Sequence, residues 1–308
     1  MAALYFCNGD DDGDMLRAMQ QATPDLDIRV WPDAGNKLDI DCAIVWMPPE
    51  DFFDGLDNLT HVYSVSAGVD HLLLHPGLSP EIPLIRLFDA GMGDRMANYV
   101  LYGALHAQRR MPELMLAQQA KMWQRCAIPD PSSVSVGILG AGALGQKVAR
   151  HLSQNGFPIK QWSRSPKQTI GTHFIGDDQL SAFLAASQIL VCLLPLTDST
   201  TGILNKALFS GLPDGAYVIN PGRGQHLVVD DLLEALDSGK LNGAMIDVFE
   251  TEPLPKDSPL WHHQRLVLTP HIAATSTTNE SAEQIAQSMR DVAKGVEPRG
   301  LVDRLRGY

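Results

Sequence analysis

The sequence predicts an α/β protein with two doubly wound parallel-sheet domains and a cleft between them. Short apolar runs alternate with longer helix-forming stretches, which is the rhythm of a parallel sheet covered by helices. A Pro/Ser-rich break at residues 126–133 separates two series of such runs. The length of 308 residues suits about two domains of ordinary size.

The first series predicts five strands separated by polar or acidic stretches with helix-forming content. From about Asp94 to Gln124 the residues favour long helices that carry the chain away from this domain. The five expected strands are Leu4–Cys7, Ile28–Trp31, Ala43–Trp46, Val62–Val65 and Leu84–Leu87.

The second series predicts a more regular sheet, because its apolar runs are nearly continuous, as in strands covered on both faces. A last helix is expected after the candidate caps Thr277, Thr278 and Asn279. The six expected strands are Val134–Leu139, Ile159–Ser163, Ile189–Leu193, Tyr217–Asn220, Ala244–Val248 and Leu266–Leu268.

Composition narrows the possible partners. The formal net charge of −12 would on average repel phosphate backbones, so we expect no nucleic-acid partner. The four cysteines are scattered without CxxC spacing, which favours a reducing compartment over a disulfide framework or a zinc site. The N-terminus lacks a basic leader and no apolar run approaches membrane-spanning length, so we expect a cytoplasmic protein without membrane contact.

A glycine-rich motif follows the first strand of the second series. Gly140, Gly142 and Gly145 form G-x-G-x-x-G between that strand and a predicted helix, with Ala143 and Leu144 inside the motif. The first glycine permits a tight turn, the second lets the backbone approach a pyrophosphate, and the third allows close helix–strand contact. A glycine-rich turn without a ligand is the simpler alternative. The context favours a Rossmann-like, dinucleotide-binding domain.

The end of the next strand indicates which dinucleotide is bound. NAD-binding units usually carry an acidic residue there to hold the ribose 2′-hydroxyl, whereas this chain has Ser163, Arg164 and Ser165, with Lys167 close behind. A guanidinium can bind a 2′-phosphate through charge-assisted hydrogen bonds. We therefore expect NADP(H), with NAD(H) less favoured; solvated surface charges are the alternative reading.

Three later segments follow predicted strands, where an open α/β sheet presents its ligand crevice. They supply Arg223, Glu252 and His271. A guanidinium matches a carboxylate, an imidazole transfers protons near neutral pH, and a carboxylate beside the imidazole favours its protonated form. Taken singly, each residue has an ordinary structural explanation: a surface charge, a loop acid and a core histidine. His262 and His263 have no third ligand at useful spacing, so we expect no metal site.

The segments GAGALG, NPGRG, DVFETEPLP and TPHIA, in this order and spacing, resemble the D-isomer-specific 2-hydroxyacid dehydrogenase family. VSAGVDHL at 65–72 and MANYV at 96–100 look like the substrate loop and the start of the interdomain helix of the same family. The closing VDRLRGY, with Trp46 in the VWMPP segment, is similar to its glyoxylate/hydroxypyruvate reductase A group in particular. The resemblance implies a discontinuous substrate domain of residues 1–97 plus 280–308 and a dinucleotide-binding domain of residues 98–279. It also suggests a homodimer formed through the cofactor domain.

The resemblance also implies roles for individual residues. Arg223 would bind the substrate carboxylate, His271 would donate a proton to the keto oxygen, and Glu252 would orient His271. Backbone amides around Ala67 and Gly68 would help hold the carboxylate, and Trp46 would wall the small pocket. Along the dinucleotide it implies contacts from Leu194, Pro195 and Thr197, and from Asp247 to the nicotinamide carboxamide.

The function expected on these grounds is NADPH-dependent reduction of glyoxylate or hydroxypyruvate to glycolate or D-glycerate by hydride transfer. One alternative is a dinucleotide-sensing binding protein, like the corepressors that share this fold. Another is a dehydrogenase for bulkier 2-keto acids.

Overall fold

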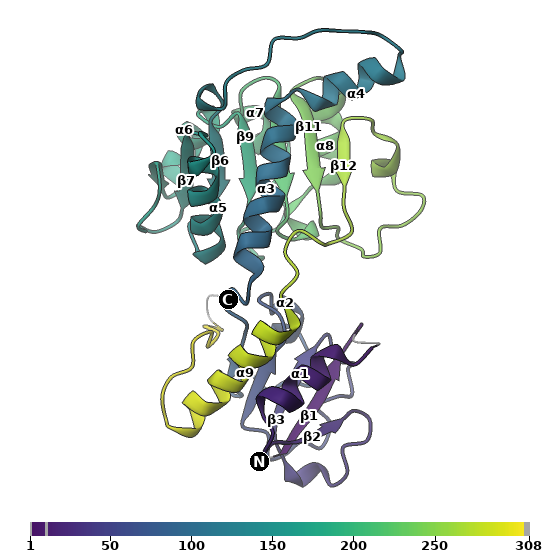
Figure 1. Ribbon diagram of the computed structural model, residues 1–308, viewed down its shortest axis with the longest axis vertical. Coiled ribbons are helices and arrows are strands. Elements are labelled where there is room, and N and C mark those ends of the chain that lie inside the picture. The colour runs from purple at the N-terminus through teal and green to yellow at the C-terminus, as the bar shows by residue number, and fades with distance from the viewer. Residues whose placement is uncertain (1, 10–11, 305–308) are drawn as a thin grey trace. The chain divides into compact units, whose positions relative to one another are not determined.

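The computed structural model describes residues 2–9 and 12–304 and contains two compact units, each built on a parallel sheet (Figure 1). Unit 1 comprises Met1–Gly91 and Ser276–Tyr308, and unit 2 comprises Met92–Thr275. The two sheets confirm the predicted α/β fold class. The sequence-based boundaries fall inside two helices, whereas the chain divides just before each of them. Residues 305–308 of the closing VDRLRGY segment lie outside the described residues.

Unit 1 has a five-stranded sheet in the order β2-β1-β3-β4-β5, with every pair of neighbouring strands parallel. Its elements are β1 (Ala2–Cys7), α1 (Asp14–Ala22), β2 (Asp27–Val30), β3 (Ile40–Trp46), β4 (His61–Ser64), α2 (Asp70–Leu73), β5 (Leu84–Ile85) and α9 (Thr278–Ala293).

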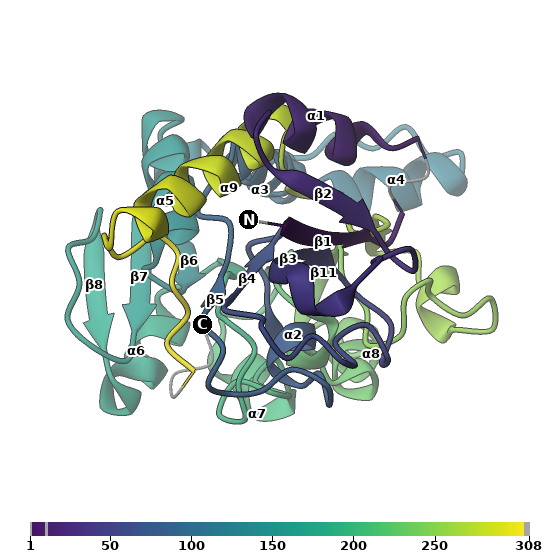
Figure 2. The ribbon, with the colours of Figure 1, turned by 90° about the horizontal axis from the view of Figure 1, so that it is seen from below.

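The two ends of the chain meet in the core of unit 1. Figure 2 shows α1 and α9 side by side, and they pack against each other over one face of the sheet. Met19 of α1 and Ile285 of α9 are buried there with Ile44 of β3. Phe52 and Leu72 belong to the core on the other face. The C-terminal helix is therefore part of the N-terminal core.

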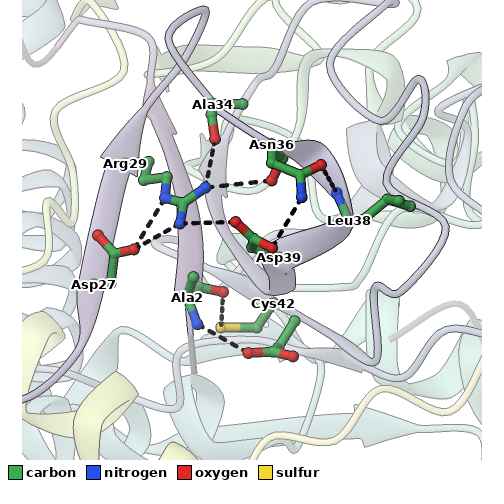
Figure 3. A network of polar contacts seen from close by, with 9 residues as sticks. Ala2, Asp27, Arg29, Ala34, Asn36, Leu38, Asp39 and Cys42 are labelled. Carbon is green, nitrogen blue, oxygen red and sulfur yellow. Dashed lines mark hydrogen bonds and ion pairs between the residues drawn. The ribbon is translucent and has the colours of Figure 1, made fainter.

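An arginine fixes the turn between β2 and β3 (Figure 3). The Arg29 guanidinium lies 2.9 Å from the Asp27 carboxylate and 3.3 Å from that of Asp39. The same group donates to the carbonyls of Ala34, at 3.0 Å, and Asn36, at 3.3 Å. Five donors on one planar group suit this task, since the four groups that the guanidinium meets here are all acceptors.

Unit 2 has a seven-stranded parallel sheet in the order β12-β11-β10-β9-β6-β7-β8. Its strands are β6 (Val136–Leu139), β7 (Ile159–Ser163), β8 (Thr172–Ile175), β9 (Ile189–Cys192), β10 (Ala216–Asn220), β11 (Leu241–Ile246) and β12 (Leu266–Leu268). Its helices are α3 (Met92–Gln108), α4 (Met111–Gln119), α5 (Ala143–Gln154), α6 (Leu180–Ala185), α7 (Lys206–Gly211) and α8 (Val229–Asp237).

Helices cover both faces of the larger sheet. In Figure 1, α3 and α5 cross the near face, where Val100 and Val148 pack on Ile138 of β6. The helices α6, α7 and α8 contribute to the core on the other face, with Phe183 and Phe209 buried there. Cover on both faces explains why the central strands are almost wholly apolar.

The structure confirms each of the eleven strands expected from the sequence and adds β8, which the sequence did not predict. The β8 residues THFI are partly or fully exposed at the sheet edge, so no apolar run marks them. Thr277 is the N-cap residue of α9, but its side chain makes no capping hydrogen bond. Across residues 2–9 and 12–304, no helix has the length and apolar character required to cross a membrane.

Candidate active site

The carboxyl ends of the parallel strands in unit 2 share one edge of the sheet. From β6 the chain winds one way through β7 and β8, and from β9 it winds the other way through β12. Ligands of open α/β sheets bind where the strand order reverses in this way. The predicted segments of unit 2 all follow strands and therefore lie along this edge.

The glycine motif forms the turn between β6 and α5. Gly140 has φ +113, and a Cβ there would lie 2.7 Å from the carbonyl of Leu193. A Cβ on Gly145 would clash with the Gly140 carbonyl, whereas one on Gly142 would meet nothing within 4 Å. Gly142 is the N-cap of α5, so the first N–H groups of that helix face an open approach. The turn has the form that a pyrophosphate requires.

The segment after β7 carries the two predicted cations. Arg164 and Lys167 are exposed, whereas Ser163 is buried at the end of the strand. The Ser163 hydroxyl donates to the Ser165 carbonyl at 2.8 Å, and Nε2 of His173 lies 2.8 Å from the same oxygen. Since the hydroxyl has one proton, His173 is the donor of the second bond. The sequence analysis missed His173 because β8, which holds it, has no apolar signature.

The turn after β9 carries Leu194, Pro195 and Thr197 and is held by Thr200. The Thr200 hydroxyl donates to the Pro195 carbonyl at 2.7 Å and accepts from the Thr197 N–H at 2.8 Å. This turn lies between the glycine motif and the β10 segment along the sheet edge.

His271 and Glu252 form a direct pair. Nδ1 of His271 lies 2.7 Å from Oε2 of Glu252, and the other carboxylate oxygen accepts the Phe249 N–H at 2.9 Å. The side chains are 46% and 35% exposed, so the pair is accessible to a ligand. With Nδ1 bound to the carboxylate, Nε2 is the nitrogen that can exchange a proton with a substrate.

Asp247 builds the turn that holds His271. Its carboxylate is buried and accepts the N–H groups of Ile272, at 2.9 Å, and Ala273, at 2.8 Å. Its main-chain carbonyl accepts the His271 N–H at 2.8 Å. His271 has φ +54, a left-handed conformation that a non-glycine residue keeps only where its surroundings enforce it.

A hydrogen-bonded chain extends the Asp247 network to α3. The Thr269 hydroxyl donates to Asp247 at 2.6 Å, so the Tyr99 hydroxyl, 2.7 Å from Thr269, must be the donor to it. Burial raises the pKa of Tyr99, which therefore keeps the proton that it donates. Asp247 therefore has a structural role in this turn. Its expected contact with the nicotinamide carboxamide stays a prediction.

Arg223 follows β10, next to the β11 end that leads to Glu252. Its guanidinium donates to the Gly222 carbonyl at 2.8 Å, and its own N–H donates to Nδ1 of His226 at 3.2 Å. A Cβ on Gly224 would overlap the backbone of Phe249. The Arg223 segment and the Glu252 loop are thus in backbone contact.

The expected substrate residues of unit 1 follow neighbouring strands of the five-stranded sheet. Trp46 is the last residue of β3, and its ring packs edge-on against the His71 ring, with 4.6 Å between the two ring centroids. Ala67 and Gly68 lie in the loop after β4, where the Gly68 N–H donates to the Ser66 hydroxyl at 3.2 Å. The sequence analysis did not single out His71 as a site residue.

Two further observations bear on the site. A hollow of about 320 Å³ lies behind the Glu252 loop, lined by residues such as Leu227, Phe249 and Leu260, but none of the predicted site residues lines it. The described residues bring together no group of three or more His, Cys, Asp or Glu side chains able to hold a metal ion.

The doubly wound sheet, with its glycine turn at the strand reversal, is a dinucleotide-binding domain. The family model for the NAD-binding domain of D-isomer-specific 2-hydroxyacid dehydrogenases matches residues 101–273. The chain belongs to the D-isomer-specific 2-hydroxyacid dehydrogenase family and is an oxidoreductase of that family.

Solved structures agree along the whole chain. A D-isomer-specific 2-hydroxyacid dehydrogenase from Xanthobacter autotrophicus Py2, in complex with NADPH and MES, is 37% identical; the match covers 100% of this chain and 99% of that one, with a TM-score of 0.94. The NADPH-dependent glyoxylate/hydroxypyruvate reductase from Sinorhizobium meliloti, with NADP and sulfate, is 34% identical over 100% and 99%, with a TM-score of 0.93. A probable 2-hydroxyacid dehydrogenase from Rhizobium etli CFN 42, with NADP, HEPES and L(+)-tartaric acid, is 33% identical over 100% and 99%, with a TM-score of 0.90.

Proposed function

We propose that this protein reduces a small 2-keto acid, glyoxylate or hydroxypyruvate, to glycolate or D-glycerate with NADPH. The observation that carries the proposal is the accessible His271–Glu252 pair, 2.7 Å apart, on the sheet edge that also holds Arg223 and the glycine turn. The NADPH-dependent glyoxylate/hydroxypyruvate reductase among the similar structures supports this choice of substrate and cofactor.

The residues of unit 2 fit NADP(H). The open N-cap at Gly142 suits the pyrophosphate, and the exposed cations Arg164 and Lys167 suit a 2′-phosphate. Bound there, NADPH supplies the hydride that reduces the keto carbon. In this proposal, the dinucleotide also contacts Leu194, Pro195 and Thr197, which lie on the turn after β9.

The other proposed roles are those that the family resemblance implies, and the charges and geometry of the residues support them. Arg223 binds the carboxylate of the keto acid through its planar fork. Nε2 of His271 gives its proton to the keto oxygen, which becomes the hydroxyl of the product. Glu252 holds Nδ1 and stabilises the imidazolium before transfer. In unit 1, the Ala67 and Gly68 amides and the Trp46 ring keep the substrate-binding roles that the family resemblance implies.

We also propose that the protein is a homodimer. Large apolar side chains are exposed along α3, α4 and the segment after them, and Trp123 is 93% exposed. A patch of this kind on one part of a domain marks a protein contact. A second copy is the occupant favoured by the family resemblance. The exposed side chains are Tyr102, Leu105, Met111, Met115, Met122 and Trp123.

The proposed activity is tested by following NADPH oxidation with glyoxylate, hydroxypyruvate, pyruvate and phenylpyruvate, and repeating the panel with NADH. We expect the highest kcat/KM with NADPH and one of the two smaller, more polar acids. Preference for phenylpyruvate would indicate a dehydrogenase for bulkier acids, and nucleotide binding without turnover of any acid would favour a dinucleotide-sensing protein.

Replacement of His271 by Ala should lower kcat by about 10²–10⁴-fold, the usual contribution of a proton donor. His262→Ala is the matched control, since His262 is an exposed histidine outside the site. Steady-state assays at saturating NADPH measure both variants. A loss of less than threefold in His271→Ala would remove the assigned role.

Replacement of Arg164 by Ala should weaken NADPH binding by about 10–100-fold, the loss of one charge-assisted hydrogen bond, and leave NADH nearly unaffected. Titration calorimetry with each nucleotide measures both affinities. Arg150→Ala, at an exposed position on α5, is the control. Equal weakening of NADPH and NADH would contradict 2′-phosphate recognition by Arg164.

Replacement of Trp123 by Asp should raise the dimer dissociation constant at least about tenfold, because a charge would replace a large apolar contact. Sedimentation velocity over a dilution series measures it. Leu74→Asp changes another exposed apolar residue, 84% exposed and outside the patch, and should have no effect. A monomeric wild-type protein at micromolar concentration would refute the dimer.

A further inference from the structure

His226 is a completely buried histidine one turn from Arg223, and the mechanism above gives it no part. It is the last residue of the short 3₁₀ turn Gly224–His226. A polar ring with no exposure to water must find its hydrogen-bond partners inside the protein. The partners that it finds lie in two different site segments.

Each ring nitrogen of His226 is bonded to main chain. Nδ1 lies 3.2 Å from the Arg223 N–H, and Nε2 lies 3.3 Å from the Pro195 carbonyl. An amide N–H can only donate and a carbonyl can only accept, so the ring is neutral with its proton on Nε2. The Cys192 thiol also lies 3.7 Å from Nδ1, and burial raises the pKa of that thiol to about 12. The contacts leave the imidazole no proton to exchange with a substrate.

The main chain of His226 is anchored independently of its ring. The Leu204 N–H donates to the His226 carbonyl at 2.8 Å, and the Gly202 N–H donates to the Gln225 carbonyl at 2.8 Å. On the other side, a Cβ on Gly222 would lie 3.1 Å from Nδ1, so the glycine lets the ring lie against the chain. The imidazole is therefore a fixed connection between the Arg223 and Pro195 segments.

We propose that His226 is a positioning residue that sets the main-chain direction at Arg223 relative to the turn at Pro195. Through it, the group that binds the substrate carboxylate is held in register with a segment that lines the dinucleotide. The inference rests on the proposed function for the roles of Arg223 and Pro195. The positioning itself rests only on the hydrogen bonds of the imidazole.

Two matched variants separate the two ring bonds. His226→Asn places a side-chain oxygen near Nδ1, which keeps the acceptor for the Arg223 N–H and loses the reach to Pro195. His226→Gln places an amide nitrogen near Nε2, which keeps the donor to the Pro195 carbonyl and loses the acceptor for the Arg223 N–H. Both are amides that leave the buried site polar, and each variant is first checked for a cooperative melting transition.

The first readout is hydrogen exchange of the Arg223 amide in the whole protein without substrate. We expect protection close to wild type in His226→Asn and at least about tenfold faster exchange in His226→Gln, the effect of losing one hydrogen bond. The second is steady-state kinetics at saturating NADPH. The KM for the keto acid should rise about tenfold in His226→Gln, which frees the Arg223 segment, and less than about threefold in His226→Asn, with kcat less affected. Measured at saturating keto acid, the KM for NADPH should show the opposite order, rising about tenfold in His226→Asn, which frees the Pro195 turn, and less than about threefold in His226→Gln.

Equal exchange rates in the two variants, or equal changes in KM that follow their melting temperatures, would reduce His226 to a packing residue and overturn the proposal. If the wild-type protein reduces none of the keto acids, the proposed function fails. The exchange contrast between the variants still decides the positioning in that case, because it requires no turnover.

Discussion

The common direction of the seven strands in unit 2 is the constraint on which the candidate site depends. Because the strands are parallel, all their carboxyl ends meet one edge of the sheet. The reversal between β6 and β9 puts the glycine turn in the middle of that edge, with the cation-bearing segment on one side and the His271–Glu252 pair on the other. The parallel topology thus places segments that are far apart in the sequence along the same edge of the sheet.

Buried polar groups then set the fine geometry along this edge. Asp247 accepts main-chain and hydroxyl donors from the His271 turn, and His226 connects a main-chain group in the segment after β9 with one in the segment after β10. A buried carboxylate or imidazole without partners would cost several kcal/mol, so each holds its turn in the arrangement that satisfies it. The exposed side chains of the candidate site are therefore positioned by buried side chains, Asp247 and His226 among them.

Sequence reasoning reached the fold class because apolar runs reveal strands that are covered on both faces. It missed β8 because an exposed edge strand of four residues has no such run. It also located the segments that carry Arg223, Glu252 and His271, because these segments follow predicted strands and the carboxyl ends of parallel strands share one edge of the sheet. It did not predict His226 or His173, because the structural role of each histidine is defined by its hydrogen-bond partners, and these come from Pro195, Arg223 and Ser163 across the fold.

The split of unit 1 between the two ends of the chain affects the order in which the protein can fold during synthesis. The face of the five-stranded sheet that α1 and α9 cover includes Tyr5, Ile44 and Tyr63. The ribosome must produce all of Met92–Thr275 before α9 exists to complete that face. Unit 2, which is continuous, can close its core first, and the nascent N-terminal sheet stays partly uncovered until the last helix emerges.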